Sequence, residues 1–260
     1  MASQALPARG ARLGRQVAPG LVPRQREQRA EVPTVRAVVL ALPGGNALST
    51  RRRSPMAAAA IWPLARHLVR AGAADGVAAH VVHYRFRGWN GGHAHPAEDA
   101  EWAVSEAVRR YGDVPVCLVG LDMGARAALH AGGHSAVRSV VALAPWLPEG
   151  PEPEPVKQLN GRQVLIVHGT DDATTDPELS YGLAERAKKV NREVCRFEVH
   201  TDGHGLHHHR PEVFALTADF VLGSLLERPF ARPVADALAA PPPLGLRMPL
   251  ASGFGRSLRA

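Results

Sequence analysis

Six runs of consecutive apolar residues, each the length of one buried strand, alternate with segments of helical periodicity in this 260-residue chain. The apolar runs are 35–42, 76–85, 114–120, 137–145, 162–169 and 193–200. The helical patterns are 54–72, 96–112, 123–133, 177–190 and 210–227. Continuously apolar strands separated by helices are typical of a mostly parallel sheet that is covered on both faces. The alternation therefore predicts a single α/β domain over residues 34–227, long enough to bury a substantial core.

The two ends of the chain lack this periodicity and hold its excess positive charge. The formal net charge of +7 divides into +5 for the first 30 residues and +4 for residues 228–260, which leaves −2 between them. Scattered Pro, Gly and Arg predict disordered tails at 1–33 and 228–260. Because the basic residues do not gather in the predicted domain, we do not expect a nucleic-acid partner.

Targeting and redox signals are sparse. No apolar run approaches the ~20 residues of a membrane span, and the N-terminal segment lacks the apolar centre of a secretory signal. Cys117 and Cys195 both fall in predicted buried strands, where a disulfide framework is not expected, so we expect a cytoplasmic protein with no membrane partner. Trp62 and Trp102 are expected in the core. The oligomeric state is not determined by these patterns.

A sharp turn is predicted where the run 114–120 meets the next helix. The stretch "VCLVGLDMG" ends in Gly120-Leu121-Asp122-Met123-Gly124, a strand-to-helix spacing that usually holds a serine nucleophile at its centre. The central residue here is Asp122. It is either a nucleophile with different chemistry or a relic, because aspartate tolerates the unusual backbone angles of such a turn.

Polar residues follow the other predicted strands as well. Ligands of open α/β sheets bind beyond the carboxyl ends of the strands. Thr170-Asp171-Asp172 follows the run 162–169, and Asp202-Gly203-His204 follows the run 193–200. The chain order is therefore nucleophile position, acid, histidine, which is the order of the triad in α/β hydrolases. Spacing favours Asp172 over Asp171 as the acid.

Four segments together resemble the α/β-hydrolase superfamily, with the compact, capless dienelactone-hydrolase-like branch nearest in shape. They are "PVCLVGLDMGARAAL", "VRSVVALAPW", "VLIVHGTDDATTDPE" and "DGHG". The resemblance covers residues 34–227. It implies His204 as general base, Asp172 as its orienting acid, and an oxyanion hole formed by Gly44, Gly45 and the backbone N–H of Met123.

The aspartate predicts a different reaction from that of a serine enzyme. A carboxylate attacks an ordinary ester poorly, but it can displace a leaving group from an alkyl carbon and form an alkyl ester of Asp122. His204 would then activate water to hydrolyse this ester. Haloalkane dehalogenases, fluoroacetate dehalogenases and soluble epoxide hydrolases of this superfamily work in this way. The resemblance thus implies a hydrolase with an Asp122–His204–Asp172 triad that acts on a small organic substrate and needs no cofactor.

Those enzymes bind the leaving group with donors from a helical cap, and this chain has no room for one. The corresponding insertion, 147–161, is short and rich in Pro and Glu. The residues that would line a substrate pocket instead are Asn46, Trp89, Asn90 and Trp146.

Two other interpretations remain. The first is a hydrolase-fold protein without hydrolytic turnover, which would bind a small molecule or use Asp122 and His204 for proton transfer. The second is a metal site formed by the run 207–210, "HHHR", together with His204. Adjacent histidines that open a helix point in different directions, whereas metal ligands must converge, so we expect no metal. The presence of a base and an acid at the right strand ends favours an active enzyme over a scaffold.

Overall fold

The computed structural model describes residues 9–19, 34–52, 54–150 and 153–256. Within these residues the chain forms one sheet of eight strands in the order β1-β3-β2-β4-β5-β6-β7-β8. The strands are β1 (Arg12–Gln16), β2 (Ala37–Leu42), β3 (Val77–His83), β4 (Val116–Leu121), β5 (Val137–Leu143), β6 (Gln163–Gly169), β7 (Val194–Val199) and β8 (Met248–Pro249). Neighbouring strands are parallel except for the pair β1 and β3. The predicted mostly parallel sheet is confirmed.

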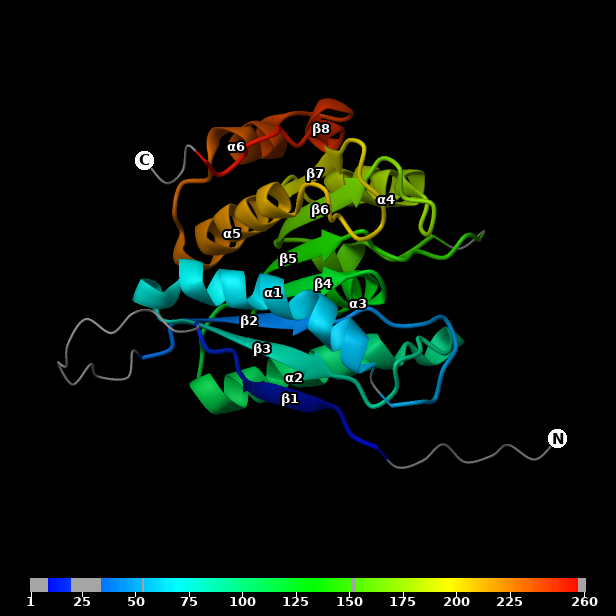
Figure 1. The fold of residues 1–260 in the computed structure, drawn as a ribbon, viewed down its shortest axis with the longest axis vertical. Helices are drawn as coiled ribbons and strands as arrows, with labels where there is room; N and C mark the ends of the chain where they lie inside the picture. Colours follow the sequence, from blue (N-terminus) through cyan, green and yellow to red (C-terminus); the bar gives the residue numbers. More distant parts are fainter. Residues whose placement is uncertain (1–8, 20–33, 53, 151–152, 257–260) are drawn as a thin grey trace.

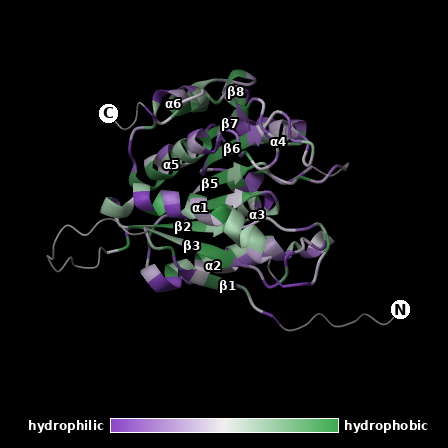
Figure 2. Ribbon diagram, viewed as in Figure 1, coloured by the Kyte–Doolittle hydropathy of each residue, from purple (hydrophilic) through white to green (hydrophobic). Residues whose placement is uncertain are grey.

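Helices cover both faces of this sheet (Figure 1). The helices are α1 (Pro55–Ala71), α2 (His95–Tyr111), α3 (Met123–Ala131), α4 (Pro177–Val190), α5 (Arg210–Leu226) and α6 (Arg232–Ala239). Buried residues of α2, α3 and α4 form one apolar cluster with the sheet, and those of α1, α5 and α6 form a second cluster on the opposite face. The strands are accordingly the most hydrophobic part of the ribbon, whereas the helices mix polar and apolar residues (Figure 2).

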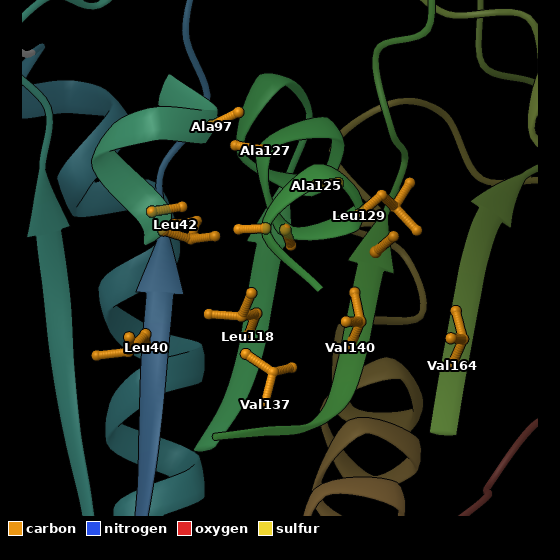
Figure 3. Close-up of a cluster of buried hydrophobic side chains, with 14 of the residues drawn as sticks. Leu40, Leu42, Ala97, Leu118, Ala125, Ala127, Leu129, Val137, Val140 and Val164 are labelled. Carbon is orange, nitrogen blue, oxygen red and sulfur yellow. The ribbon is translucent and has the colours of Figure 1, made fainter. Parts of the chain in front are cut away.

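The central strands explain why the predicted elements form. All six residues of β2 are buried, and β4 is buried along most of its length, so each strand needs apolar side chains on both faces. Small residues of α3 pack on both sides of the helix: Ala125 lies toward β4, whereas Ala127 lies beside Ala97 of α2 (Figure 3). The helix therefore sits near the sheet at the point where β4 ends.

Two tryptophans lie outside the core, contrary to expectation. The exposed fraction of Trp62 is 43% and that of Trp102 is 39%. On α1 the buried stripe includes Ile61, Leu64 and Leu68, and Trp62 lies one position beside that stripe. Successive helical residues point about 100° apart, so a residue next to a buried one can face solvent. Trp102 has the same relation to Ala103 on α2.

The structure also corrects the prediction of disordered tails. β1 adds an antiparallel strand to β3 and buries Leu13. At the other end, α6 buries Val234, and the 3₁₀ turn Leu244–Leu246 buries Leu246 before β8 joins β7. These segments place few but well-spaced apolar residues against an existing sheet, which is too weak a pattern to identify from sequence. Residues 1–8, 20–33 and 257–260 of the predicted tails lie outside the described residues.

Both cysteines are buried and unpaired, as expected. Within the part of the chain that is described, no helix is long and apolar enough to cross a bilayer.

A matched pair of substitutions measures what the C-terminal segment contributes. Leu246 is fully buried, whereas Leu244, two residues away, is 67% exposed. We expect Leu246→Ala to lower the free energy of unfolding by about 2–5 kcal/mol, the usual cost of truncating a buried leucine. Leu244→Ala should change it by less than about 0.5 kcal/mol. Chemical denaturation of both variants checks this, and equal effects would contradict the folded arrangement of the segment.

Candidate active site

The turn between β4 and α3 holds Asp122 in a strained backbone conformation. Its φ of 56° and ψ of −122° lie outside the regions that most residues adopt. The turn is possible because its neighbours are glycines. A Cβ on Gly120 would lie 2.1 Å from the carbonyl oxygen of Gly124, and a Cβ on Gly124 would lie 2.0 Å from that of Leu42. The Gly-x-Asp-x-Gly spacing therefore raises Asp122 above the end of the sheet, as the sequence predicts.

The carboxylate of Asp122 lies against the loop that follows β2. Leu42 of β2 pairs with Gly120 of β4, so the two strands deliver Pro43–Gly45 and Asp122 side by side. The backbone N–H of Gly45 donates to Oδ2 of Asp122 over 3.2 Å. Burial raises the pKa of Asp122, while the backbone N–H groups of Met123 and Gly45 and the nearby His204 act against this rise. Two of the three predicted oxyanion donors, Gly45 and Met123, thus bond to the carboxylate of Asp122 itself, whereas Gly44 lines the cavity beside it.

His204 lies in the loop after β7, and its ring faces both Asp172 and Asp122. Its Nδ1 lies 2.9 Å from Oδ2 of Asp172. Its Nε2 lies 3.7 Å from Oδ1 of Asp122, which is longer than a hydrogen bond. The imidazole therefore faces the nucleophile position with one nitrogen and the orienting acid with the other, the arrangement that a general base needs.

Asp172 rather than Asp171 is placed to act as the acid. Asp172 is buried, whereas Asp171 is exposed. Burial alone would raise the pKa of Asp172, but hydrogen bonds from Thr175, His204 and the backbone of Thr174 lower it to about 2. The group is therefore a carboxylate at neutral pH and can hold the Nδ1 proton of His204.

Three polar side chains support the site and were not identified from the sequence. The Tyr84 hydroxyl donates to the carbonyl of Pro43 over 3.2 Å and ties down the loop that carries Gly45. The Thr175 hydroxyl donates to Oδ2 of Asp172 over 2.7 Å. His168, which is fully buried, contacts the same oxygen at 3.1 Å. The one available signal was a histidine inside the otherwise apolar run "VLIVHG".

A cavity of about 490 Å³ opens beside Asp122 and His204, within the size range of small-molecule sites. Its walls include apolar side chains of α1 and α5, such as Ile61, Leu64 and Phe214. Arg87 and Arg210 add positive charge, and Asp122 is the one carboxylate among the described lining residues.

Asn46 lines this cavity, but the other three residues expected in the pocket do not. Trp89 and Trp146 lie on the guanidinium of Arg126, at 3.8 Å and 4.9 Å from its central carbon to the ring centroids. Their rings therefore cover α3 instead of the cavity. Asn90 joins two loops, since its side chain accepts from the backbone N–H of Ser49 and donates to the carbonyl of Ser49.

The histidine run at 207–209 is separated by its contacts. His209 bonds to Asp202 through its backbone N–H and its ring, whereas His207 lines the cavity. Across the described ranges there is no group of three or more potential ligands that could hold a metal ion.

Comparisons with known proteins place the fold. No protein-family model and no curated protein matches the chain, but many solved structures do. An esterase from Pyrococcus furiosus superposes with a TM-score of 0.56 at 15% identity, over 74% of this chain and 83% of the esterase. A protein from Thermus thermophilus gives 0.55 at 19% identity, over 75% and 92%. An α/β hydrolase from a deep-sea metagenome library of the Medee basin gives 0.52 at 18% identity, over 78% and 86%. The fold of this chain is therefore that of the α/β hydrolases.

Proposed function

We propose that the protein is a hydrolase in which Asp122 attacks an alkyl carbon of a small organic substrate and His204 hydrolyses the resulting ester. The observation that carries the proposal is that the two oxygens of Asp122 have different contacts. Oδ2 accepts from the backbone N–H of Gly45 at 3.2 Å, and Oδ1 faces Nε2 of His204 at 3.7 Å. A relic carboxylate has no need of either contact.

This arrangement suits a two-step displacement. In the first step an oxygen of Asp122 forms a bond to the alkyl carbon, and the leaving group departs with the bonding electrons. In the second step His204 takes a proton from water, and the hydroxide attacks Cγ of Asp122. The oxyanion that forms on Oδ2 stays beside Gly45 and Met123, whose N–H groups stabilise it. Its collapse expels the alkoxide, which takes the proton from His204 and leaves as the alcohol. The carboxyl group of Asp122 then releases the second proton of the water molecule to solvent and is a carboxylate again.

Acyl transfer, the chemistry of a serine esterase, fits the site less well. Attack of a carboxylate on an ester carbonyl would give a mixed anhydride, a high-energy intermediate. The backbone donors would also have to stabilise a new oxyanion while one of them already bonds to Asp122. Alkyl transfer uses these same donors in the hydrolysis step without moving them.

The charges around the cavity favour an anionic substrate. An anion would be repelled by Asp122, and Arg87 and Arg210 on the cavity wall offset this repulsion. Arg87 is half-buried, and its Nε donates to Ser49 Oγ over 3.2 Å, which holds the side chain in place. The apolar walls from α1 and α5 favour a compact hydrocarbon body. A short haloacid combines these properties.

Trapping the covalent ester tests the proposal. In His204→Gln the alkylation step should proceed while hydrolysis stops, so an adduct should accumulate on Asp122. The variant is incubated with haloacids, small epoxides and activated esters, and intact-mass and peptide-mass measurements locate any adduct. The matched control is His207→Gln, which replaces an exposed histidine of the same cavity wall; it should accumulate no adduct. If no compound modifies Asp122 and the wild-type protein is also inert on these compounds, the result favours the alternative of a hydrolase-fold scaffold without hydrolytic turnover.

The rate of this alkylation should depend on pH through Asp122. Only the ionised carboxylate is a nucleophile, and burial raises its pKa above the ordinary value of 3.8. As pH falls, the rate in His204→Gln should therefore decline at a higher pH than an exposed aspartate would produce. Adduct mass measured against time across the acidic range checks this, and a pH-independent rate would exclude Asp122 as the attacking group.

Replacing Arg87 should separate charge recognition from chemistry. With His204→Gln also present so that the ester accumulates, we expect Arg87→Met to slow the labelling of Asp122 by chloroacetate by about tenfold or more, the effect of losing one hydrogen bond to a charged group. Labelling by the neutral chloroacetamide should change little, and Arg87→Lys should retain part of the preference. Competition between the two reagents measures the ratio directly. An equal loss for both would show that Arg87 shapes the cavity without recognising charge.

A further inference from the structure

A second histidine contacts the same oxygen of the candidate triad acid as His204. His168 lies in β6 and is fully buried. Its Nε2 lies 3.1 Å from Oδ2 of Asp172, the same oxygen that His204 contacts at 2.9 Å. The backbone N–H groups of Thr174 and Thr175 both donate to the other oxygen, Oδ1. The two histidines therefore share one carboxylate oxygen, which also accepts from the Thr175 hydroxyl over 2.7 Å.

The surroundings of His168 determine where its proton lies. Burial is the largest cause that lowers the pKa of His168 to about 4, and Arg196 adds to it, so the ring is neutral at pH 7. A neutral imidazole has one N–H. Because the carboxylate of Asp172 only accepts hydrogen bonds, that proton belongs on Nε2. Nδ1 is then an acceptor and needs a donor.

Ser180 supplies this donor. Its Oγ lies 2.9 Å from Nδ1 of His168, and it accepts from Nε of Arg196 over 3.0 Å. The hydroxyl proton of Ser180 has two acceptors within reach, the carbonyl of Pro177 at 2.8 Å and Nδ1 of His168 at 2.9 Å. When it points at His168, the carbonyl of Pro177 still accepts from Nη2 of Arg196 over 3.1 Å.

A buried positive charge stands at the start of this chain. The side chain of Arg196 is fully buried, and its Nη1 donates to Glu198 over 2.8 Å and to the carbonyl of Leu246 over 2.9 Å. Leu246 belongs to the C-terminal segment. One line of hydrogen bonds therefore runs from Nε of Arg196 through Ser180 and His168 to Asp172.

We propose that His168 is a positioning residue of the triad, which donates Nε2–H to Oδ2 of Asp172 in competition with Nδ1–H of His204. Neighbouring hydrogen bonds polarise one another in a buried network, so the chain from Arg196 strengthens the donation by His168. The donation by His168 therefore weakens the hydrogen bond between Nδ1–H of His204 and Asp172. It also holds the carboxylate of Asp172 in place, and that carboxylate orients the ring of His204. A role of this competition in catalysis rests on the proposed function. The competition between His168 and His204 for Asp172 exists in the protein without substrate.

Nuclear magnetic resonance of ¹⁵N-histidine-labelled protein without substrate tests the proposal. Nitrogen chemical shifts distinguish the two neutral tautomers and the charged ring. We expect His168 to be neutral with its proton on Nε2 at and above neutral pH. An Nδ1–H tautomer or a charged His168 would overturn the assignment.

Three variants test the competition through the Nδ1–H proton of His204, whose resonance moves downfield as its hydrogen bond to Asp172 strengthens. His168→Leu removes the competing donor, so the resonance should move downfield. His168→Gln keeps an N–H donor and should restore the wild-type position. The matched control is His80→Leu. His80 is also buried and hydrogen-bonded at both ring nitrogens, to Gly14 and Tyr111, but lies on β3, with three strands between it and β6.

The outcomes separate positioning from simple core packing. A His204 resonance that stays in place in His168→Leu, or that His80→Leu moves equally, would overturn the proposal. If His168→Leu does not fold, Ser180→Ala is the second test. It removes the donor to Nδ1, weakens the donation by His168 and should move the His204 resonance in the same direction. These spectra need no turnover, so failure to trap an adduct on Asp122 would count against the proposed function alone.

Discussion

The close approach of two backbones at the end of β4 determines the geometry of the candidate site. Gly124 lies so near the carbonyl of Leu42 that no side chain fits between them. This contact brings α3 down onto the sheet and forces Asp122 into its strained conformation. It also sets the loop after β2 against Asp122, so this one backbone contact places both the proposed oxyanion donor Gly45 and the proposed nucleophile. Strain of this kind persists only where the surrounding structure over-determines it.

The surroundings of the two carboxylates of the site shift their pKa values in opposite directions. Asp122 is partly buried with few donors, and its pKa is raised. Asp172 is buried, but hydroxyl, imidazole and backbone donors converge on it and lower its pKa to about 2. Two carboxylates on one sheet edge thus acquire pKa values shifted in opposite directions, which suits the proposed roles of Asp122 as nucleophile and Asp172 as fixed anion.

The C-terminal segment and β1, which lie outside the predicted domain, supply hydrogen-bond partners to buried polar side chains of the sheet. The C-terminal segment supplies the carbonyl of Leu246 to Arg196, whose guanidinium bonds to Ser180 beside His168. At the other edge, β1 supplies the carbonyl of Gly14 to His80. Both contacts give a hydrogen-bond partner to a buried polar side chain, which would otherwise lower the stability of the folded protein. The C-terminal segment therefore contributes to the shell around the triad acid as well as to the core.

The sequence by itself determined the alternation of elements, the sharp turn at Asp122 and the chain order of Asp122, Asp172 and His204. These features are local, because strand-length apolar runs, helical periodicity and glycine spacing are legible within a few residues. Only the tertiary structure decided which polar groups meet. Trp89 turned toward Arg126 and away from the cavity, and His168 met Asp172 inside the core. The physical reason is that side-chain contacts depend on how strands and loops distant in sequence are brought together, and apolar patterning does not encode that arrangement.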